Sequence, residues 1–226
     1  IQQHKADFGI AWDGDFDRCF LFDGNGRFIE GYYIVGLLGA QLLQQNPSEN
    51  IVHDPRLVWN TQELATKNGG QAIQSKAGHA FIKEKMREVN AIYGGEMSAH
   101  HYFRDFGYCD SGMIPWLLIT EMMTEQNKSL AQLVDERILA YPVSGEINMT
   151  VTNAQKVLDA VLDYFSGESY ELDDTDGIGL SFDKWRFNIR SSNTEPLLRL
   201  NVESRGDISL MEQKRDLLID LIKTNS

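Results

Sequence analysis

The chain has 226 residues, which is enough for one large domain or two smaller ones, each with its own hydrophobic core. Its 33 acidic and 21 basic residues give a net charge of −12, which argues against a nucleic-acid partner because such a partner requires a basic face. Its two cysteines are too few for a disulfide framework and indicate reduced thiols in the cytoplasm, and its most apolar run, near residues 32–43, is too short to span a membrane.

The first predicted element is a buried strand over residues 6–12, followed by the loop Asp13-Gly14-Asp15-Phe16-Asp17-Arg18. Its three carboxylates, at alternate positions, project to one side of an extended or tightly turned backbone and repel one another unless a cation is bound. Oxygen ligands of this kind suit Mg²⁺ or Ca²⁺ better than zinc. An EF-hand is excluded, because its sixth and twelfth positions would be Arg18 and Gly24. An acidic surface turn stays open as the alternative to a cation site.

The start of the chain is unusual for a complete domain. Only one plausible strand precedes the acidic loop, and a single strand has no partner for its backbone groups. Because the chain also begins with Ile1 rather than methionine, we expect it to be the C-terminal part of a longer protein.

Strands and helices then alternate as far as about residue 140. Turn residues at positions 23–26 and later apolar runs with helical spacing mark the individual elements. The predicted strands cover residues 19–22, 27–29, 51–53, 72–74 and 91–93. The predicted helices cover residues 33–45, 60–68, about 79–89, 111–123 and 129–139. This alternation predicts an α/β fold with a mixed, mainly parallel sheet and covering helices.

The pattern changes near residues 140–145. Strands are predicted at residues 147–151, 170–172, 178–182, 185–190 and 197–202, with helices at 154–165 and 210–222. We therefore expect a smaller α+β domain over residues 145–226, after an α/β domain over residues 28–140. Residues 1–27 would be the end of a preceding domain together with the acidic loop.

Three further loops carry chemically useful side chains. In Gly94-Gly95-Glu96-Met97-Ser98-Ala99-His100, the glycines allow the backbone to approach a ligand closely, Glu96 and Ser98 offer an acceptor and a donor to sugar hydroxyls, and His100 can transfer a proton or bind phosphate. We expect the next residue, His101, to face a strand surface instead.

The second loop, Lys76-Ala77-Gly78-His79, opens a helix whose N-terminus presents free N–H groups, although a loop histidine alone is a weak signal. The third, Arg190-Ser191-Ser192-Asn193-Thr194, places an arginine and several donors between two strands. That density of donors favours a phosphate site over a simple polar turn.

A cation site, a hydroxyl-reading loop, a proton-transfer group and a phosphate site together indicate a phosphosugar enzyme. The motifs DGDFDR, GEMSAHH and RSSNTEP, in this order and at these separations, resemble the α-D-phosphohexomutase family, with its bacterial phosphomannomutase branch the nearest. The resemblance covers the whole chain. It implies four domains around one cleft, of which this chain would hold the end of the second, the third and the fourth. The missing N-terminal domains would then be its partners.

The resemblance also implies roles for individual residues. Asp13, Asp15 and Asp17 would bind one Mg²⁺ ion, and Arg18 would lie beside the phosphorylated centre. Glu96 and Ser98 would read the O3 and O4 hydroxyls of the hexose phosphate. The substrate's non-reacting phosphate would be held by Arg190, Ser192, Asn193 and Thr194. Cleft residues that contact substrate or assist proton transfer would be Arg56, His79 and His100. Ala99 replaces the glycine that many relatives carry, so the loop backbone would be less free.

The implied activity is interconversion of mannose 6-phosphate and mannose 1-phosphate through a phosphoserine and a hexose 1,6-bisphosphate, which also serves as activator. The family's serine lies in a Thr-X-Ser-His-Asn motif, and no serine of this sequence has that context. We therefore expect little activity from the chain alone. Three alternatives stay open: phosphoglucomutase or dual specificity, a non-catalytic phosphosugar-binding module, and a structural Mg²⁺- or Ca²⁺-binding protein.

Overall fold

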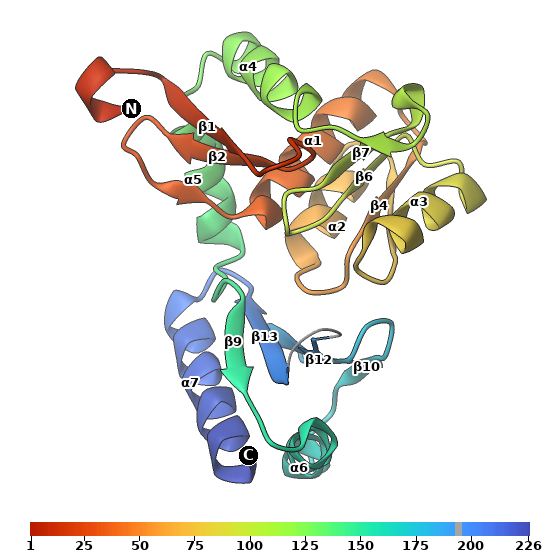
Figure 1. The fold of residues 1–226 in the computed structure, drawn as a ribbon, viewed down its shortest axis with the longest axis vertical. Helices are drawn as coiled ribbons and strands as arrows, with labels where there is room; N and C mark the ends of the chain where they lie inside the picture. Colours follow the sequence, from red (N-terminus) through yellow and green to blue (C-terminus); the bar gives the residue numbers. More distant parts are fainter. Residues whose placement is uncertain (193–195) are drawn as a thin grey trace. The chain divides into compact units, whose positions relative to one another are not determined.

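The chain folds into two compact units in a computed structural model that describes residues 1–192 and 196–226 (Figure 1). The first unit comprises Ile1–Asp54 and Val58–Ile138, and the second comprises Pro55–Leu57 and Leu139–Ser226. Residues 1–27, for which the sequence predicts the end of a separate domain, lie in the first unit. No helix among the described residues is both long and apolar enough to cross a bilayer.

The elements of the first unit alternate along the chain much as the sequence predicts. Its strands are β1 (Phe8–Trp12), β2 (Cys19–Asp23), β3 (Phe28–Ile29), β4 (Asn50–His53), β5 (Gln71–Gln74), β6 (Tyr93–Gly95), β7 (His101–Phe103) and β8 (Cys109–Asp110). Its helices are α1 (Gly31–Gln45), α2 (Trp59–Lys67), α3 (His79–Glu88), α4 (Ile114–Gln126) and α5 (Leu130–Ala140), which leads into the second unit.

The main sheet of the first unit is mixed, as predicted, and has the strand order β5-β4-β6-β7-β8. Strand β4 is parallel to β5 and β6, whereas β7 and β8 continue the sheet antiparallel. Helix α3 packs on the face that carries Val52 and Tyr102, and α1 packs on the opposite face against Ile51 and Tyr93. The sheet is therefore covered on both faces, and the loops after β4 and β6 leave from the same edge, where ligand sites form in α/β proteins.

Strand β6 lies two residues later than its predicted position, because it includes both glycines that the sequence assigns to a loop. A Cβ on Gly94 would come within 2.6 Å of Met86 Sδ, and one on Gly95 within 2.7 Å of Val35. Glycine is needed here for close packing between the two helical layers, so the residues read as turn formers lie inside a strand.

Strands β1, β2 and β3 form a separate antiparallel sheet in that order. Strand β1 pairs with β2 from Phe8↔Asp23 to Trp12↔Cys19. The expectation that the first strand has no partner is wrong, because β2 folds back on it. The acidic loop is consequently the connection of a β-hairpin.

The second unit is an α+β fold with the antiparallel sheet β10-β11-β12-β13-β9. Its strands are β9 (Ile147–Thr150), β10 (Glu171–Asp173), β11 (Ile178–Ser181), β12 (Trp185–Ser191) and β13 (Leu197–Ser204), and its helices are α6 (Ala154–Phe165) and α7 (Ile208–Asn225). Both helices share one apolar core with the sheet.

Side chains of strand β12 point alternately toward the apolar core and away from it, and the face away from the core is polar. Arg186, Asn188 and Arg190 lie opposite Glu203, Asn201 and Arg199 of β13, respectively. Since successive residues of a strand point to opposite faces, these three pairs share the face away from the apolar core.

Candidate active site

The hairpin loop between β1 and β2 gathers three aspartates. Oxygen atoms of Asp13, Asp15 and Asp17 lie within 4.8 Å of one another. Phe16 adopts the left-handed backbone conformation, with φ of 62°, and so helps to turn the loop sharply. Asp13 accepts hydrogen bonds from the backbone N–H and the Nε of Arg18. The predicted metal ligands and Arg18 therefore form one cluster.

The charges of this cluster require compensation. Burial raises the pKa of Asp17, and the neighbouring Asp15 and Asp13 carboxylates raise it further against the opposing effect of His100. Burial also raises the pKa of Asp13, but the hydrogen bonds and charge of Arg18 outweigh it, so this pKa lies below its usual value. The Oδ1 atom of Asp17 is buried without a hydrogen-bond partner in the described part of the chain. An unsatisfied carboxylate oxygen among three acids fits a hard divalent cation.

His100 lies beside the acidic loop. Its backbone forms an isolated bridge with Arg18, and the Cys19 N–H donates to the Ala99 carbonyl at 3.1 Å. His100 Nδ1 is 3.4 Å from Asp110 and 3.8 Å from Asp17. These contacts bring the predicted proton-transfer residue next to the predicted metal ligands.

Asp110 and Lys83 extend this cluster and were not identified from the sequence. Lys83 Nζ is 2.8 Å from Asp110 Oδ1. Both Asp110 and Ser111 can be read from the sequence as the cap of the following helix. The structure favours Ser111, because its hydroxyl accepts hydrogen bonds from the N–H groups of Met113 and Ile114 at the start of α4. From the local sequence, Asp110 can equally be a helix cap or a charged partner of other residues, and only the folded structure shows that it pairs with Lys83 and His100.

Glu96 is buried and connects its own loop, residues 96–100, to the start of α3. Its two carboxylate oxygens accept hydrogen bonds from the Gly78 N–H and the Tyr102 hydroxyl, each at 2.7 Å. His79 is the first residue of α3 and is exposed. The structure thus places the predicted residue Glu96 against Gly78, which directly precedes the predicted residue His79.

The loop that carries Ser98 is held in place by contacts with Asp54 and Gly31. The Met97 N–H donates to Asp54 Oδ2 at 2.7 Å, and a Cβ on Gly31, at the start of α1, would lie 2.3 Å from the Met97 carbonyl oxygen. Ala99 is buried and has φ of 71°, a left-handed conformation that glycine adopts more readily. The loop therefore has a defined conformation in spite of the alanine.

His101 faces the sheet, as the sequence predicts. It is buried, its Nδ1 lies 2.7 Å from the Tyr93 hydroxyl, and burial lowers its pKa to about 3. This enclosed imidazole packs against the Tyr93 ring within the sheet.

The predicted phosphate-binding residue Arg190 and the predicted cleft residue Arg56 both belong to the second unit. Arg56 Nη1 lies 3.2 Å, and Arg190 Nη2 3.6 Å, from the same oxygen of Glu146. Arg199 Nη1 is 3.5 Å from the other oxygen. The Ser192 N–H donates to the Leu197 carbonyl at 2.9 Å. Asn193 and Thr194 lie outside the described residues.

Arg199 and Glu146 were not identified from the sequence. Arg199 joins the cluster because it lies directly opposite Arg190 in the β12–β13 register. The alternation of polar and apolar residues along both strands is the signal that points to this face. Pairing register, however, depends on tertiary structure.

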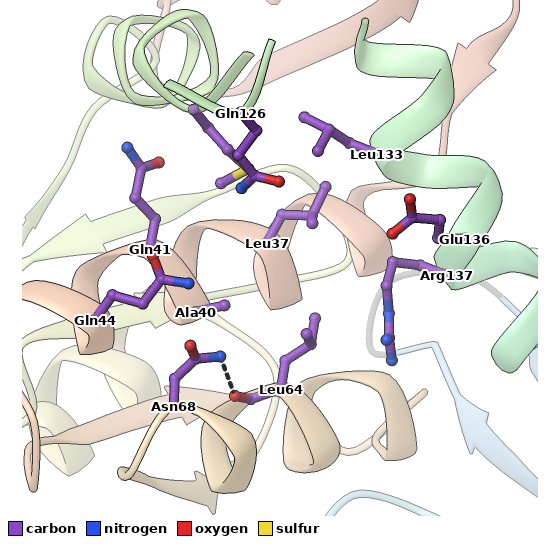
Figure 2. Close-up of a pocket in the computed structure, with 11 residues that line it drawn as sticks. Leu37, Ala40, Gln41, Gln44, Leu64, Asn68, Gln126, Leu133, Glu136 and Arg137 are labelled. Carbon is purple, nitrogen blue, oxygen red and sulfur yellow. Dashed lines mark hydrogen bonds between the residues drawn. The ribbon is translucent and has the colours of Figure 1, made fainter. Parts of the chain in front are cut away.

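A separate cavity of about 150 Å³ lies among helices α1, α2, α4 and α5 of the first unit. Figure 2 shows its apolar lining by Leu37, Ala40 and Leu64, with amide side chains around it. Asn68 donates a hydrogen bond to the Leu64 carbonyl at 2.8 Å. None of the sequence-predicted site residues is among the residues that line this cavity, so it is distinct from the candidate site.

The first unit is an α/β fold with a cluster of three aspartates. The second unit presents clustered arginines on one face of a sheet, and arginines of this kind can bind phosphate. Residues 30–141 match the family model for the phosphoglucomutase/phosphomannomutase alpha/beta/alpha domain III, and residues 146–220 match the model for the C-terminal domain of the same family. The chain belongs to the phosphoglucomutase/phosphomannomutase family.

Two curated relatives show which members of the family are similar to this chain. The chain is 59% identical over 222 residues to a protein named phosphomannomutase from Escherichia coli strain K12, covering 98% of this chain and 49% of that protein. It is 58% identical over 223 residues to "Phosphohexose mutases" of Xanthomonas campestris, covering 99% of this chain and 50% of that protein. The chain thus spans about half the length of these relatives.

A solved structure shares the fold. The crystal structure of a phosphoglucomutase/phosphomannomutase family protein from Burkholderia thailandensis matches with a TM-score of 0.83 at 25% identity. The match covers 99% of this chain and 48% of that one. The agreement over almost the whole chain confirms the predicted fold class.

Proposed function

We propose that this chain is part of a phosphomannomutase, which interconverts mannose 6-phosphate and mannose 1-phosphate. High identity to proteins named phosphomannomutase supports this substrate. The observation that carries the proposal is the contact within the first unit between the acidic loop and the Glu96–His100 loop, through the backbone bridge of Arg18 and His100. Cation ligands and groups suited to sugar hydroxyls are thereby held side by side.

Asp13, Asp15 and Asp17 would hold one Mg²⁺ ion, since their clustered oxygens fit a hard cation. When bound, the ion would supply electrostatic stabilisation for negative charge on phosphoryl oxygens. Arg18 adds a fixed positive charge at the same place, held there by its hydrogen bonds to Asp13.

The remaining residues bind, orient and move protons. Ser98 is half-buried and available to a sugar hydroxyl, while Glu96 keeps its loop in place and has lone pairs left for a further donor. His100 faces two carboxylates and is placed to take up or release a proton at Nδ1. In the second unit, Arg56, Arg190 and Ser192 would hold a phosphate, with Asn193 and Thr194 as proposed neighbours.

The complete reaction needs a phosphoryl donor in addition. We infer that a phosphoserine from a Thr-X-Ser-His-Asn motif supplies it, with hexose 1,6-bisphosphate as intermediate and activator, and that the reaction takes place in the cytoplasm. The chain alone should then show little turnover of mannose 1-phosphate in the presence of Mg²⁺ and the bisphosphate. Substantial turnover would contradict the requirement for that serine.

Substrate binding tests the proposal directly. Calorimetric titration of mannose 6-phosphate into the chain with Mg²⁺ should show saturable binding. Arg190→Met should weaken it by about tenfold or more, because a charged hydrogen-bond donor to phosphate is lost. Arg215→Met is the matched control, since Arg215 lies on helix α7 of the same unit and forms an ion pair with Asp216 at 2.8 Å. Absence of saturable binding by the unmodified chain would refute a phosphosugar function.

Dual specificity for glucose and mannose phosphates is the second candidate, favoured by the relative named "Phosphohexose mutases". A parallel titration with glucose 6-phosphate separates the two. Equal affinities would support dual specificity, whereas a preference for mannose 6-phosphate would support a phosphomannomutase.

A further inference from the structure

Three guanidinium groups of the second unit converge on one carboxylate, that of Glu146. Arg56, Arg190 and Arg199 approach it within 3.2, 3.6 and 3.5 Å. The side chains of Arg56 and Arg190 are 4% and 12% exposed, and those of Glu146 and Arg199 are 21% and 27% exposed. The group is therefore mostly buried, yet Glu146 and Arg199 keep an opening to solvent.

Hydrogen-bond donors outnumber acceptors in this cluster. Charge-assisted N–H···O contacts are normally about 2.7–2.9 Å long, so all three arginines lie farther from Glu146 than a strong contact requires. The Nε atoms of Arg190 and Arg199 are buried with no acceptor among residues 1–192 and 196–226. Asp176 adds a second carboxylate, 3.7 Å from Arg190. Among the residues that the structure describes, three positive charges thus face the carboxylates of Glu146 and Asp176, and the Nε donors of Arg190 and Arg199 have no acceptor.

The backbone that carries Arg56 is held in place by Arg186. Arg186 donates hydrogen bonds to the carbonyls of Pro55 and Arg56, at 3.2 and 3.0 Å. Arg186 is itself buried and paired with Glu203 at 3.0 Å. Arg190 and Arg199 are held by the β12–β13 register. The positive charges are therefore preorganised, and Glu146 is the carboxylate that all three share.

We propose that Glu146 sets the affinity of this cluster for the phosphate group of a sugar phosphate. The Glu146 carboxylate occupies guanidinium N–H groups that a phosphate dianion would otherwise use, and its negative charge repels that dianion. Both effects weaken phosphate binding and so keep it reversible. This role rests on the proposed phosphosugar function and assigns to Glu146 a specificity- and affinity-determining part that is distinct from direct substrate contact. A bound phosphate would accept hydrogen bonds from the Nε atoms of Arg190 and Arg199. It would compete with the Glu146 carboxylate for the Nη donors of the three arginines.

The test is Glu146→Gln in the full chain, with inorganic phosphate and mannose 6-phosphate titrated by calorimetry at low salt. Glutamine keeps the shape but removes the competing charge, so both ligands should bind about tenfold more tightly. Affinity should also fall more steeply with added salt than in the unmodified chain. The matched control is Glu168→Gln, which removes one charge from an exposed position of the same unit and should change affinity less than twofold.

Glu146→Asp is a second variant that tests the proposal if the glutamine variant fails to fold. It keeps the negative charge, but its shorter side chain holds that charge farther from the guanidinium groups. It should bind phosphate a few-fold more tightly than the unmodified chain. Unchanged or weaker binding by both variants, with circular dichroism showing a native fold, overturns the proposal and leaves Glu146 a structural ion-pair partner. If Arg190→Met binds phosphate as well as the unmodified chain, the phosphate site itself is wrong and the proposed function fails with it.

Discussion

Replacing Glu203 by glutamine tests the support beneath the arginine cluster. Arg186 and Glu203 are 1% and 0% exposed, and their charged atoms lie 3.0 Å apart. Glutamine preserves side-chain size and one acceptor but leaves the positive charge of Arg186 buried without its counter-ion. Two unit charges at this distance attract by about 5 kcal/mol at an effective dielectric constant of about 20.

Measured losses on breaking one half of a buried pair are about 3–5 kcal/mol, a large part of the roughly 5–15 kcal/mol that stabilises a domain. We therefore expect Glu203→Gln to lower the unfolding free energy of the second unit by about 3 kcal/mol or more. At a urea m-value of about 1.5 kcal/mol per molar, its transition midpoint should fall by about 2 M.

Hydrogen exchange during urea titration is the suitable assay, because it reports the two units separately. Glu168→Gln is the control and should cost less than about 0.5 kcal/mol, since that side chain is exposed. A loss below about 1 kcal/mol for Glu203→Gln would refute the reasoning that the pair is desolvated. The double variant Arg186→Met with Glu203→Leu should recover part of the loss, limited by the carbonyls of Pro55 and Arg56 that lose their donor.

Three further predictions concern the first unit. Asp15→Asn should weaken Mg²⁺ binding measured by calorimetry about tenfold, whereas Asp105→Asn, at a 93% exposed side chain, should not. Because burial lowers the pKa of His101 from 6.5 to about 3, the unfolded chain binds a proton that the native chain does not, so stability should fall as pH drops below about 6.5, by up to about 1.4 kcal/mol per unit. His101→Gln should lack this component of the pH dependence in urea unfolding; an identical slope would contradict a buried neutral imidazole. Gly31→Ala should destabilise the unit by about 1–3 kcal/mol and weaken mannose 6-phosphate binding, since its Cβ would meet the Met97 carbonyl oxygen at 2.3 Å.

Elements with a strong local signal were predictable. The helix predicted over residues 154–165 is confirmed as α6, and the Asn153 side chain caps it by accepting a hydrogen bond from the Lys156 N–H. The position of β6 was less predictable: Gly94 and Gly95 read locally as a turn, but tight packing between two helical layers places them in a strand. Local preference was overridden by tertiary contact, as is common for short buried strands.

The sequence by itself determined the chemistry of each loop: alternate aspartates, the Glu96–His100 segment and the Arg190 loop all follow from residue type and spacing. Only the tertiary structure decided which groups meet them. Asp110 reaches His100 because β7 and β8 pair, and Lys83 reaches Asp110 because α3 covers the sheet.

The same distinction holds for the arginine cluster in the second unit. Arg199 joins Arg190 because the consecutive strands β12 and β13 pair in one register. Glu146 joins them because it directly precedes β9, which pairs with β13 although it lies far from it in the sequence. The physical reason is that residue spacing fixes which way neighbouring side chains point, whereas burial and cross-strand register arise only when the whole chain has packed.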